Sequence, residues 1–344
     1  MIWRCPACRG QLVEAGPTLR CASCAAGFEM VSGIPDLRIN APAWIDQDED
    51  REHARRIAEE TAGWELEDVV RHVFRVVRGR KAENVEYRTR QVIEAPRRLR
   101  REVLGWLADA TAARPFLDLG CGPGMLIAAA SAEGRIGIGL DVSMVWLVVA
   151  KRLIEAAGGT PVLAAGFAEA LPLANEAVGA VVSLDVIEHV GDQVGYLREI
   201  DRVTAPGGAI ALATPNRFSL GAEPHVHVWG VGWLPRSLQQ RYAERRSGMD
   251  YAFTRLLSTR EMRRLLTRHT GFDCEFLVPA ISDEEILLAS WRRAMLARIY
   301  NRGVRLSWMR GAALAVGAFF RVVGKKSGRT PASGHAVPPL EPAS

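Results

Sequence analysis

Short apolar runs alternate with segments of helical periodicity over the middle of the chain, from about residue 114 to residue 276. Each run is a few residues long and ends near glycine or acidic residues, as buried parallel strands do. Five such runs occur, in PFLDL (115–119), RIGIGLDVS (135–143), PVLAAGFAEALPL (161–173), AVGAVVSLDVIEHVGD (177–192) and TAPGGAIALATPN (204–216). Strands that alternate with helices predict a doubly wound α/β fold, with a parallel sheet and ligands at the carboxyl ends of the strands.

The pattern changes on both sides of this region. Residues 41–113 are charged and rich in helix-forming residues, and REVLGWLADAT (101–111) has the apolar spacing of an amphipathic helix. On the C-terminal side, FDCEFLV (272–278) predicts a sixth strand and AFFRVVGKK (318–326) a seventh, antiparallel strand. The segment between them, 284–316, is expected to form a helical insertion.

These elements divide the chain into four parts. We expect a small unit in residues 1–40, a helical linker in 41–113, a seven-stranded, mostly parallel α/β domain in 114–326 and a tail in 327–344. The tail is rich in proline, serine and glycine, so we expect it to be disordered.

The composition is that of a globular protein. The chain has 344 residues, of which 48% are hydrophobic, and a net charge of +5, which argues for a large core and against global disorder. Charge-free apolar runs fall short of the roughly 20 residues that a membrane span needs. Met1 leads directly to Cys5 without the pattern of a signal peptide, so we expect a cytoplasmic protein.

The charge is unevenly distributed near the C-terminus. Residues 286–329 contain ten Lys/Arg and no Asp/Glu, interspersed with tryptophan and aliphatic residues. Arginines on an apolar helix suit an anionic lipid surface, so we expect 284–316 to contact the inner face of the membrane. The alternative is a helix packed on its own domain with its arginines in solvent.

The N-terminal forty residues contain two pairs of cysteines in C-x-x-C spacing. Two such turns place four thiolates around one ion, which predicts a structural Zn²⁺ site in a small ribbon. Two disulfides would be the alternative, but they require an oxidising compartment and hence an export signal. The predicted ligands are Cys5, Cys8, Cys21 and Cys24.

The segment PFLDLGCGPGMLIAAAS combines a buried strand, a glycine turn and a helix. Glycines at such a turn let the backbone bend sharply and approach a ligand closely. Dinucleotide-binding dehydrogenases use a similar turn. Asp118 inside the strand, the later segment DVIEH and the Pro-Gly-Gly turn argue against a dehydrogenase.

With its five motifs in this order, the region from about 114 to 276 resembles class I S-adenosylmethionine-dependent methyltransferases. Within them, it is most similar to the branch with the ubiquinone-biosynthesis O-methyltransferases. The segment FEMVSGIPDL (28–37), together with the cysteines, resembles small zinc-ribbon proteins that partner some RNA and protein methyltransferases.

The resemblance implies roles for individual residues around S-adenosylmethionine. The turn of Gly120, Cys121, Gly122 and Gly124 would approach the methionine end, with Asp118 near the ammonium group. Asp141, followed by Val142, would hold the ribose, and Phe167 and Ala168 would flank the adenine. Leu184 and Asp185 would face the sulfonium and the acceptor.

One position departs from the family pattern. The family commonly has an aspartate, which accepts a hydrogen bond from the adenine amino group, where this chain has Phe167. A phenylalanine cannot accept that bond, but its ring could pack on the adenine while the backbone of Ala168 supplies recognition.

Methyl transfer to a hydroxyl requires alignment and removal of a proton. His189 is the best candidate for the base, with Asp185 and Glu188 beside it. The resemblance also suggests that Asp185, Glu188 and His189 hold a divalent ion such as Mg²⁺. A third interpretation is that Glu188 and His189 only cap the following helix.

The segment AEPHVHVWGVGWLPR (222–236) follows the fifth strand and contains two histidines one residue apart. In this fold the region overhangs the acceptor, so we expect a lid or a wall of the acceptor pocket. In an extended segment His225 and His227 would point the same way. Either is a candidate base, or a metal ligand with Glu223, and a hydrogen-bonded loop is the alternative.

Three functions compete at this stage. The first is O-methylation of a small-molecule, quinone-like or glycan- or lipid-linked acceptor. The second is methylation of ribosomal or transfer RNA, with the ribbon recognising RNA, although the basic residues are scattered. The third is a non-catalytic binding module, against which the intact glycine turn and Asp141 argue. The sequence gives no indication of oligomeric state.

Overall fold

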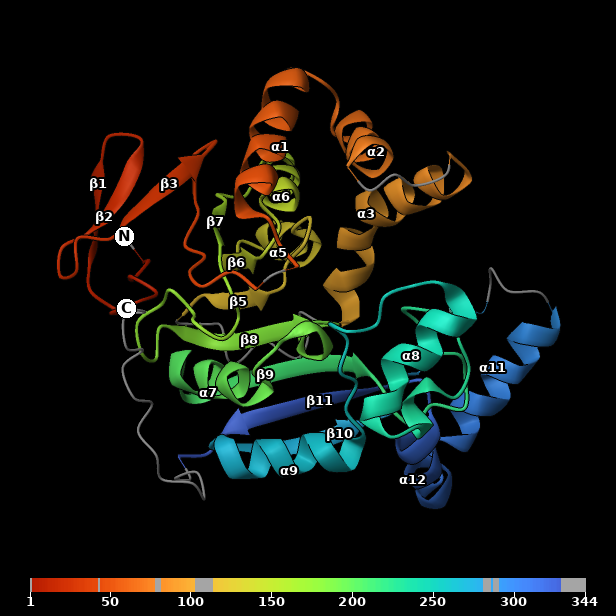
Figure 1. Cartoon of the computed structure of the whole chain (residues 1–344). Helices are drawn as coiled ribbons and strands as arrows, with labels where there is room; N and C mark the ends of the chain where they lie inside the picture. The colour runs from red at the N-terminus through yellow and green to blue at the C-terminus, as the bar shows by residue number, and fades with distance from the viewer. Residues whose placement is uncertain are drawn as a thin grey trace. The chain divides into compact units, whose positions relative to one another are not determined.

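The computed structural model describes residues 2–42, 44–77, 82–102, 114–280, 286 and 291–328 (Figure 1). Most of the helix expected at 101–111, part of the expected insertion (284–285 and 287–290) and the tail from 329 onward lie outside the described residues. The strands are β1 (Leu12–Ala15), β2 (Thr18–Cys21), β3 (Gly27–Val31), β4 (Ile34–Pro35), β5 (Phe116–Leu119), β6 (Gly137–Asp141), β7 (Val162–Ala165), β8 (Val178–Leu184), β9 (Thr204–Pro215), β10 (Phe272–Leu277) and β11 (Phe319–Lys326). The helices are α1 (Gln47–Glu60), α2 (Leu66–Val76), α3 (Ala82–Glu102), α5 (Met125–Ser131), α6 (Met144–Ala156), α7 (Gln193–Val203), α8 (Arg236–Ser247), α9 (Thr259–His269), α11 (Trp291–Gly303) and α12 (Ser307–Val316), with short 3-10 turns at Ile187–His189 and Val231–Trp233.

Seven strands form the main sheet in the order β10-β11-β9-β8-β5-β6-β7. β5 pairs in parallel with both β6 and β8, and β6 pairs in parallel with β7. β11 pairs antiparallel with β10. Every residue of β5 is buried, as expected for a central parallel strand covered on both faces. The predicted seven-stranded, mostly parallel α/β fold is confirmed.

The fifth strand begins earlier than the sequence pattern predicts. The Pro-Gly-Gly segment is not a turn before the strand, because β9 runs through it from Thr204. A side chain at Gly208 would lie 2.7 Å from the carbonyl oxygen of Gly179 in β8. The glycine is therefore needed for close approach of the backbones of two strands.

The described residues fall into two compact units. The first unit contains the chain up to Ser183 together with Arg198–Ala209, and the second contains Leu184–Leu197 and the chain from Ile210 onward. Each unit is described separately below. Among the helices of the described residues, none is long and apolar enough to cross a lipid bilayer.

The first unit begins with a four-stranded antiparallel ribbon, β1-β2-β3-β4. Its end joins the main sheet, because Asp36 forms a parallel bridge with Ala165 and the Leu37 N–H donates to the Ala165 carbonyl at 2.8 Å. Helix α1 follows and packs on α6 and β3 (Figure 1). The ribbon and α1 thus lie against the β7 side of the sheet.

The four cysteines of the ribbon converge as the spacing predicts. Their sulfur atoms all lie within 4.8 Å of one another, with 3.4 Å between Cys8 and Cys21 and 3.7 Å between Cys5 and Cys24. A tetrahedral zinc ion with sulfur at about 2.3 Å separates its ligands by about 3.8 Å. None of the four cysteines forms a disulfide. The geometry fits a metal ion held by four thiolates.

The second unit contains a small core of its own. Val226, Val228 and Val231 are buried together with Ala243 of α8 and with Tyr251. The segment 222–236 is therefore anchored by its valines, while His227 and Trp229 between them are exposed.

We expect one zinc ion per chain. Replacing Cys8 by Ser should abolish the bound zinc and lower the melting temperature, because the folding energy of such a ribbon comes largely from metal binding. Metal analysis and thermal unfolding measure both effects. Cys274→Ser is the matched control, since Cys274 lies in β10 outside the cluster, and it should keep its zinc. A Cys8→Ser protein with a full zinc content would contradict the site.

Candidate active site

The turn after β5 depends on its glycines. Gly120, Gly122 and Gly124 have φ angles of 77°, 50° and 74°, a region that residues with side chains rarely adopt. At Gly124 a Cβ would also lie 2.8 Å from the Cβ of Ala150 in α6. Cys121 is buried between them, so its side chain packs inward. The turn leaves a bare backbone at the carboxyl end of β5.

Asp141, the last residue of β6, connects this turn to the next loop. Its Oδ2 accepts a hydrogen bond from the Gly122 N–H at 2.8 Å, and its Oδ1 accepts one from the Ser143 N–H at 2.8 Å. Two backbone N–H groups from two different loops therefore hold the carboxylate in one orientation.

Asp118 lies inside β5, one residue before its end, and is buried. Burial, with a smaller contribution from the charge of Asp141, raises the pKa of the Asp118 carboxyl to about 7. A carboxyl group in such surroundings favours a cationic partner, because a nearby positive charge stabilises its ionised form.

The other predicted cofactor residues of the first unit follow β6 and β7. Phe167 and Ala168 are buried just beyond β7, where the Gly166 N–H donates to the Asp141 carbonyl at 3.0 Å. Val142 directly follows Asp141. The carboxyl ends of adjacent parallel strands lie at one edge of a sheet, so these residues and the glycine turn share that edge. Leu184 belongs to the second unit and is half-buried.

In the second unit, Glu188 is almost fully buried, at 1% exposure. Its Oε2 accepts a hydrogen bond from the Thr214 hydroxyl at 3.0 Å, whereas its Oε1 has no partner among the described residues. Burial raises the pKa of the Glu188 carboxyl to about 7. Asp185 stands just before, with a φ angle of 56° that is unusual for a residue with a side chain. A buried acid with an unpaired oxygen, as in Glu188, is typical of a functional site.

Glu223 organises the loop that carries the two histidines. Its side chain is 3% exposed, and its Oε2 accepts hydrogen bonds from the N–H groups of His225 at 2.8 Å and Val226 at 2.9 Å. Its Oε1 lies 2.5 Å from Nδ1 of His225. Burial of the ring opposes its charged form, but the hydrogen bond to Glu223 and the nearby acids prevail and raise the pKa of His225.

His225 also meets His189. The two rings lie edge to face, with 4.8 Å between their centroids. Ligand atoms of Glu188, His189 and His225 all lie within 4.8 Å of one another. The structure thus brings together His189 and His225, two of the predicted catalytic residues, with Glu188, which the sequence suggested as an ion ligand. Asp185 does not belong to this cluster.

The sequence-based picture of this loop needs two corrections. The segment is not extended, because the chain turns between Glu223 and Val228, the His227 N–H donates to the Glu223 carbonyl at 2.8 Å and His227 has a φ of 56°. Alternation therefore does not place the two histidines on one side. Glu223 does not form a metal-binding group with the two histidines among the described residues, because the group that could hold an ion consists of Glu188, His189 and His225.

Two residues near this cluster were not identified from the sequence. Thr214 lies near the end of β9. Ligands bind at the carboxyl ends of parallel strands, and this rule could have identified Thr214 from the sequence. Tyr251 carries a buried hydroxyl without a partner among the described residues, and burial raises its pKa. Tyr251 has no local sequence signal, since it follows α8 in an irregular segment.

The role expected for Asp118 predicts pH-dependent binding of S-adenosylhomocysteine, which carries the same ammonium group. With a pKa of about 7 in the free protein, Asp118 is increasingly protonated below pH 7 and must lose that proton on binding. Affinity should therefore fall as the pH is lowered from 8 to 6. Calorimetry in buffers of different ionisation enthalpy should show proton release. Asp118→Asn should bind more weakly and lose this dependence, and proton uptake on binding would contradict the role.

Comparison with known proteins finds a family and several relatives that part of this chain resembles. Residues 117–212 match a family described as a methyltransferase domain. The ubiquinone biosynthesis O-methyltransferase of Cereibacter sphaeroides is 35% identical over 140 residues, which are 37% of this chain and 55% of the relative. That of Mesorhizobium japonicum is 34% identical over 141 residues, 38% of this chain and 56% of the relative. The chain thus spans about half the length of the curated relatives it matches.

One similar solved structure is an S-adenosylmethionine-dependent methyltransferase from Thermotoga maritima, described as a possible histamine N-methyltransferase. It is 19% identical, and the match covers 75% of this chain and 99% of that protein with a TM-score of 0.42. The sheet order and the glycine turn that follows β5 come from this chain's own structure. They agree with the match of residues 117–212 to a methyltransferase domain.

Proposed function

We propose that this protein transfers a methyl group from S-adenosylmethionine to a hydroxyl group of a small-molecule acceptor. The observation that carries the proposal is the hydrogen bond between buried Glu223 and His225 in a chain whose methyltransferase domain is intact at the glycine turn and Asp141. The curated relatives, which are O-methyltransferases of ubiquinone biosynthesis, support oxygen as the methylated atom.

The chemistry asks two things of the protein. S-adenosylmethionine supplies an electrophilic methyl group, and alignment of the reacting groups can contribute about 7–11 kcal/mol. The glycine turn, Asp118 and Asp141 would supply that alignment on the cofactor side. A hydroxyl acceptor must also lose its proton, for which a base with a pKa near neutrality is best suited.

His225 is the residue we assign as that base. Its Nδ1–H donates to Glu223, which leaves Nε2 as the acceptor for the proton of the substrate hydroxyl. Glu223 thereby fixes the tautomer and stabilises the imidazolium that forms. His189 and Glu188, which adjoin His225, are placed to hold the acceptor by hydrogen bonds.

A divalent ion is the second candidate for activating the hydroxyl. It is favoured by the unpaired Oε1 of Glu188, which lies with the two imidazoles in a cluster that could hold an ion. Two imidazoles and one carboxylate suit zinc or iron better than the Mg²⁺ suggested by the sequence, since Mg²⁺ prefers oxygen ligands. A bound ion would lower the pKa of the acceptor hydroxyl.

The function is tested by transfer of labelled methyl from S-adenosylmethionine into fractionated host extract. Label in the small-molecule or lipid fraction is expected, and it would identify the acceptor for kinetics. Label in RNA would instead support the RNA methyltransferase, and an absence of both transfer and S-adenosylhomocysteine binding would support a non-catalytic module.

With the acceptor known, Glu223→Gln should lower kcat by about 10²-fold, the scale of general-base catalysis. Because the negative charge raises the pKa of His225, its removal should also move the acidic limb of the pH–rate profile to lower pH. Glu244→Gln, on the exposed surface of α8, is the matched control. A variant with unchanged kcat and unchanged profile would exclude His225 as the base. Activity abolished by a chelator and restored by a metal would favour the ion.

We further propose that α11 and α12 contact an anionic membrane, where a lipid-linked or hydrophobic acceptor would be found. Three apolar residues one helical turn apart, Trp291, Met295 and Ile299, are exposed on α11, and Trp291 reaches 71%. Trp308 of α12 is 72% exposed. Exposed arginines lie on α11 (Arg298 and Arg302), between the helices (Arg305) and on α12 (Arg310).

Apolar anchors surrounded by arginines match the chemistry of an anionic lipid surface. The protein should therefore sediment with vesicles containing phosphatidylglycerol but not with pure phosphatidylcholine, and salt should weaken the binding. Trp291→Ala combined with Trp308→Ala should reduce it at least several-fold. Trp64→Ala is the control, because Trp64 is also exposed but lies in the first unit. Equal sedimentation of all variants would refute this surface.

A further inference from the structure

Arg38, just beyond the ribbon, is a fully buried cation whose side chain is 0% exposed. Its Nε and Nη2 donate to the two carboxylate oxygens of Asp36 at 2.8 and 2.7 Å. Its Nη1 donates at 2.7 Å to Asp50 and at 2.7 Å to the carbonyl oxygen of Val142. A buried guanidinium is tolerated only when its donors are paired, so this arrangement fixes the groups around it.

Asp50, in the first turn of α1, completes the arrangement from the other side. Its Oδ2 accepts from Arg38 and also, at 2.8 Å, from the N–H of Met144, the first residue of α6. Ser143, the N-cap residue of α6, makes no capping hydrogen bond with its own side chain. Asp50 therefore caps α6 in its place, where a negative charge also interacts favourably with the helix dipole.

These contacts hold the residues that directly follow Asp141. Arg38 binds the carbonyl group of Val142, and Asp50 binds the N–H of Met144. Between them, the Ser143 N–H donates to Asp141. The loop that orients the Asp141 carboxylate is thus held on both sides by hydrogen bonds from residues in the N-terminal part of the chain.

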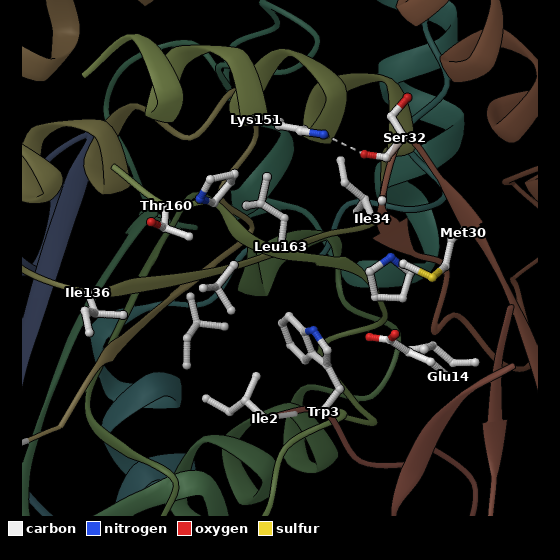
Figure 2. Close-up of a pocket in the computed structure, with 16 residues that line it drawn as sticks. Ile2, Trp3, Glu14, Met30, Ser32, Ile34, Ile136, Lys151, Thr160 and Leu163 are labelled. Carbon is white, nitrogen blue, oxygen red and sulfur yellow. Dashed lines mark hydrogen bonds between the residues drawn. The ribbon is translucent and has the colours of Figure 1, made fainter. Parts of the chain in front are cut away.

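A cavity and a further hydrogen bond lie at the same junction between the ribbon and the sheet. A cavity of about 660 Å³ separates part of the ribbon from the edge of the sheet, with Met30 and Ile34 on one side and Leu163 on the other (Figure 2). At its rim, Lys151 of α6 points to the ribbon and donates to the Ser32 carbonyl at 2.8 Å (Figure 2). This hydrogen bond is thus a further polar contact between the ribbon and α6 beside the cavity.

We propose that Arg38 and Asp50 are positioning residues for the ribose end of the cofactor, and that the ribbon and α1 support cofactor binding through them. This inference rests on the proposed role of Asp141 in binding the ribose hydroxyls. It gives the N-terminal region a function within the methyltransferase reaction, in addition to metal binding.

The test compares two carboxylates of the same helical turn. Asp50→Ala should weaken binding of S-adenosylhomocysteine by about 10-fold, within the usual range of coupling between sites. Asp48→Ala should change it less than twofold, because the side chain of Asp48 is 87% exposed and pairs with Arg51 without reaching the loop. Calorimetry measures the affinities, and melting temperatures show that the variants are folded.

A cofactor analogue without the two ribose hydroxyls separates positioning from general destabilisation. Asp50→Ala should leave the affinity for this analogue nearly unchanged relative to wild type, because the analogue makes no use of Asp141. An equal loss for both ligands would overturn the positioning role. In steady state, the KM for S-adenosylmethionine should rise while kcat at saturation stays close to that of wild type.

Arg38→Lys provides a second, independent variant. Lysine keeps a positive charge beside Asp36, but it cannot bind two carboxylates and the Val142 carbonyl at once. The same selective loss of S-adenosylhomocysteine affinity is expected. If wild type binds S-adenosylhomocysteine and neither variant binds it more weakly, the inference is wrong although the proposed function stands. If wild type does not bind it, the proposed function itself fails.

Discussion

The carboxylate of Asp141 is the group on which the order of the cofactor side depends. It accepts one N–H from the glycine turn after β5 and one from the loop after β6, so a single side chain joins two loops that belong to different strands. The bond to Gly122 helps to offset the conformational entropy that the glycines of this turn lose on folding. Arg38 and Asp50 hold the loop after β6 by hydrogen bonds, and these bonds connect the sheet to the N-terminal part of the chain.

The two units each contain one buried acid whose pKa is raised to about 7, Asp118 in the first and Glu188 in the second. In both cases burial is the main cause, so the free protein holds two carboxyl groups that would gain from a cationic or hydrogen-bonding ligand. Glu223 contrasts with them, because it is equally buried but makes hydrogen bonds through both oxygens. The same residue type thus serves the loop as a structural acceptor and the candidate site as a group without a full set of partners.

Features carried by local spacing could be predicted from the sequence. Within each motif, such as the cysteine pairs and the glycine turn, the residues lie close together in the sequence, so the cysteine cluster and the seven-stranded, mostly parallel sheet could be predicted from pattern. The contact between Glu223 and His225 is also local, but its meaning depended on the turn at His227, which periodicity does not show. Arg38 and Val142 are 104 residues apart, and nothing in the pattern of either segment indicates that they meet. Long-range polar contacts of this kind arise from the packing of the ribbon and α1 on the sheet, which a single sequence does not specify.

The position of β11 has a consequence for the synthesis of the chain. It follows β10 in the sequence, yet in the sheet of the described residues it lies between β9 and β10 and pairs with β10. The edge of β9 therefore stays open while the ribosome makes more than one hundred further residues, roughly ten seconds of translation at typical rates. An unpaired edge strand is a template for association with other chains. Protection of that edge by a chaperone would therefore matter more for this chain than for one whose sheet closes in sequence order.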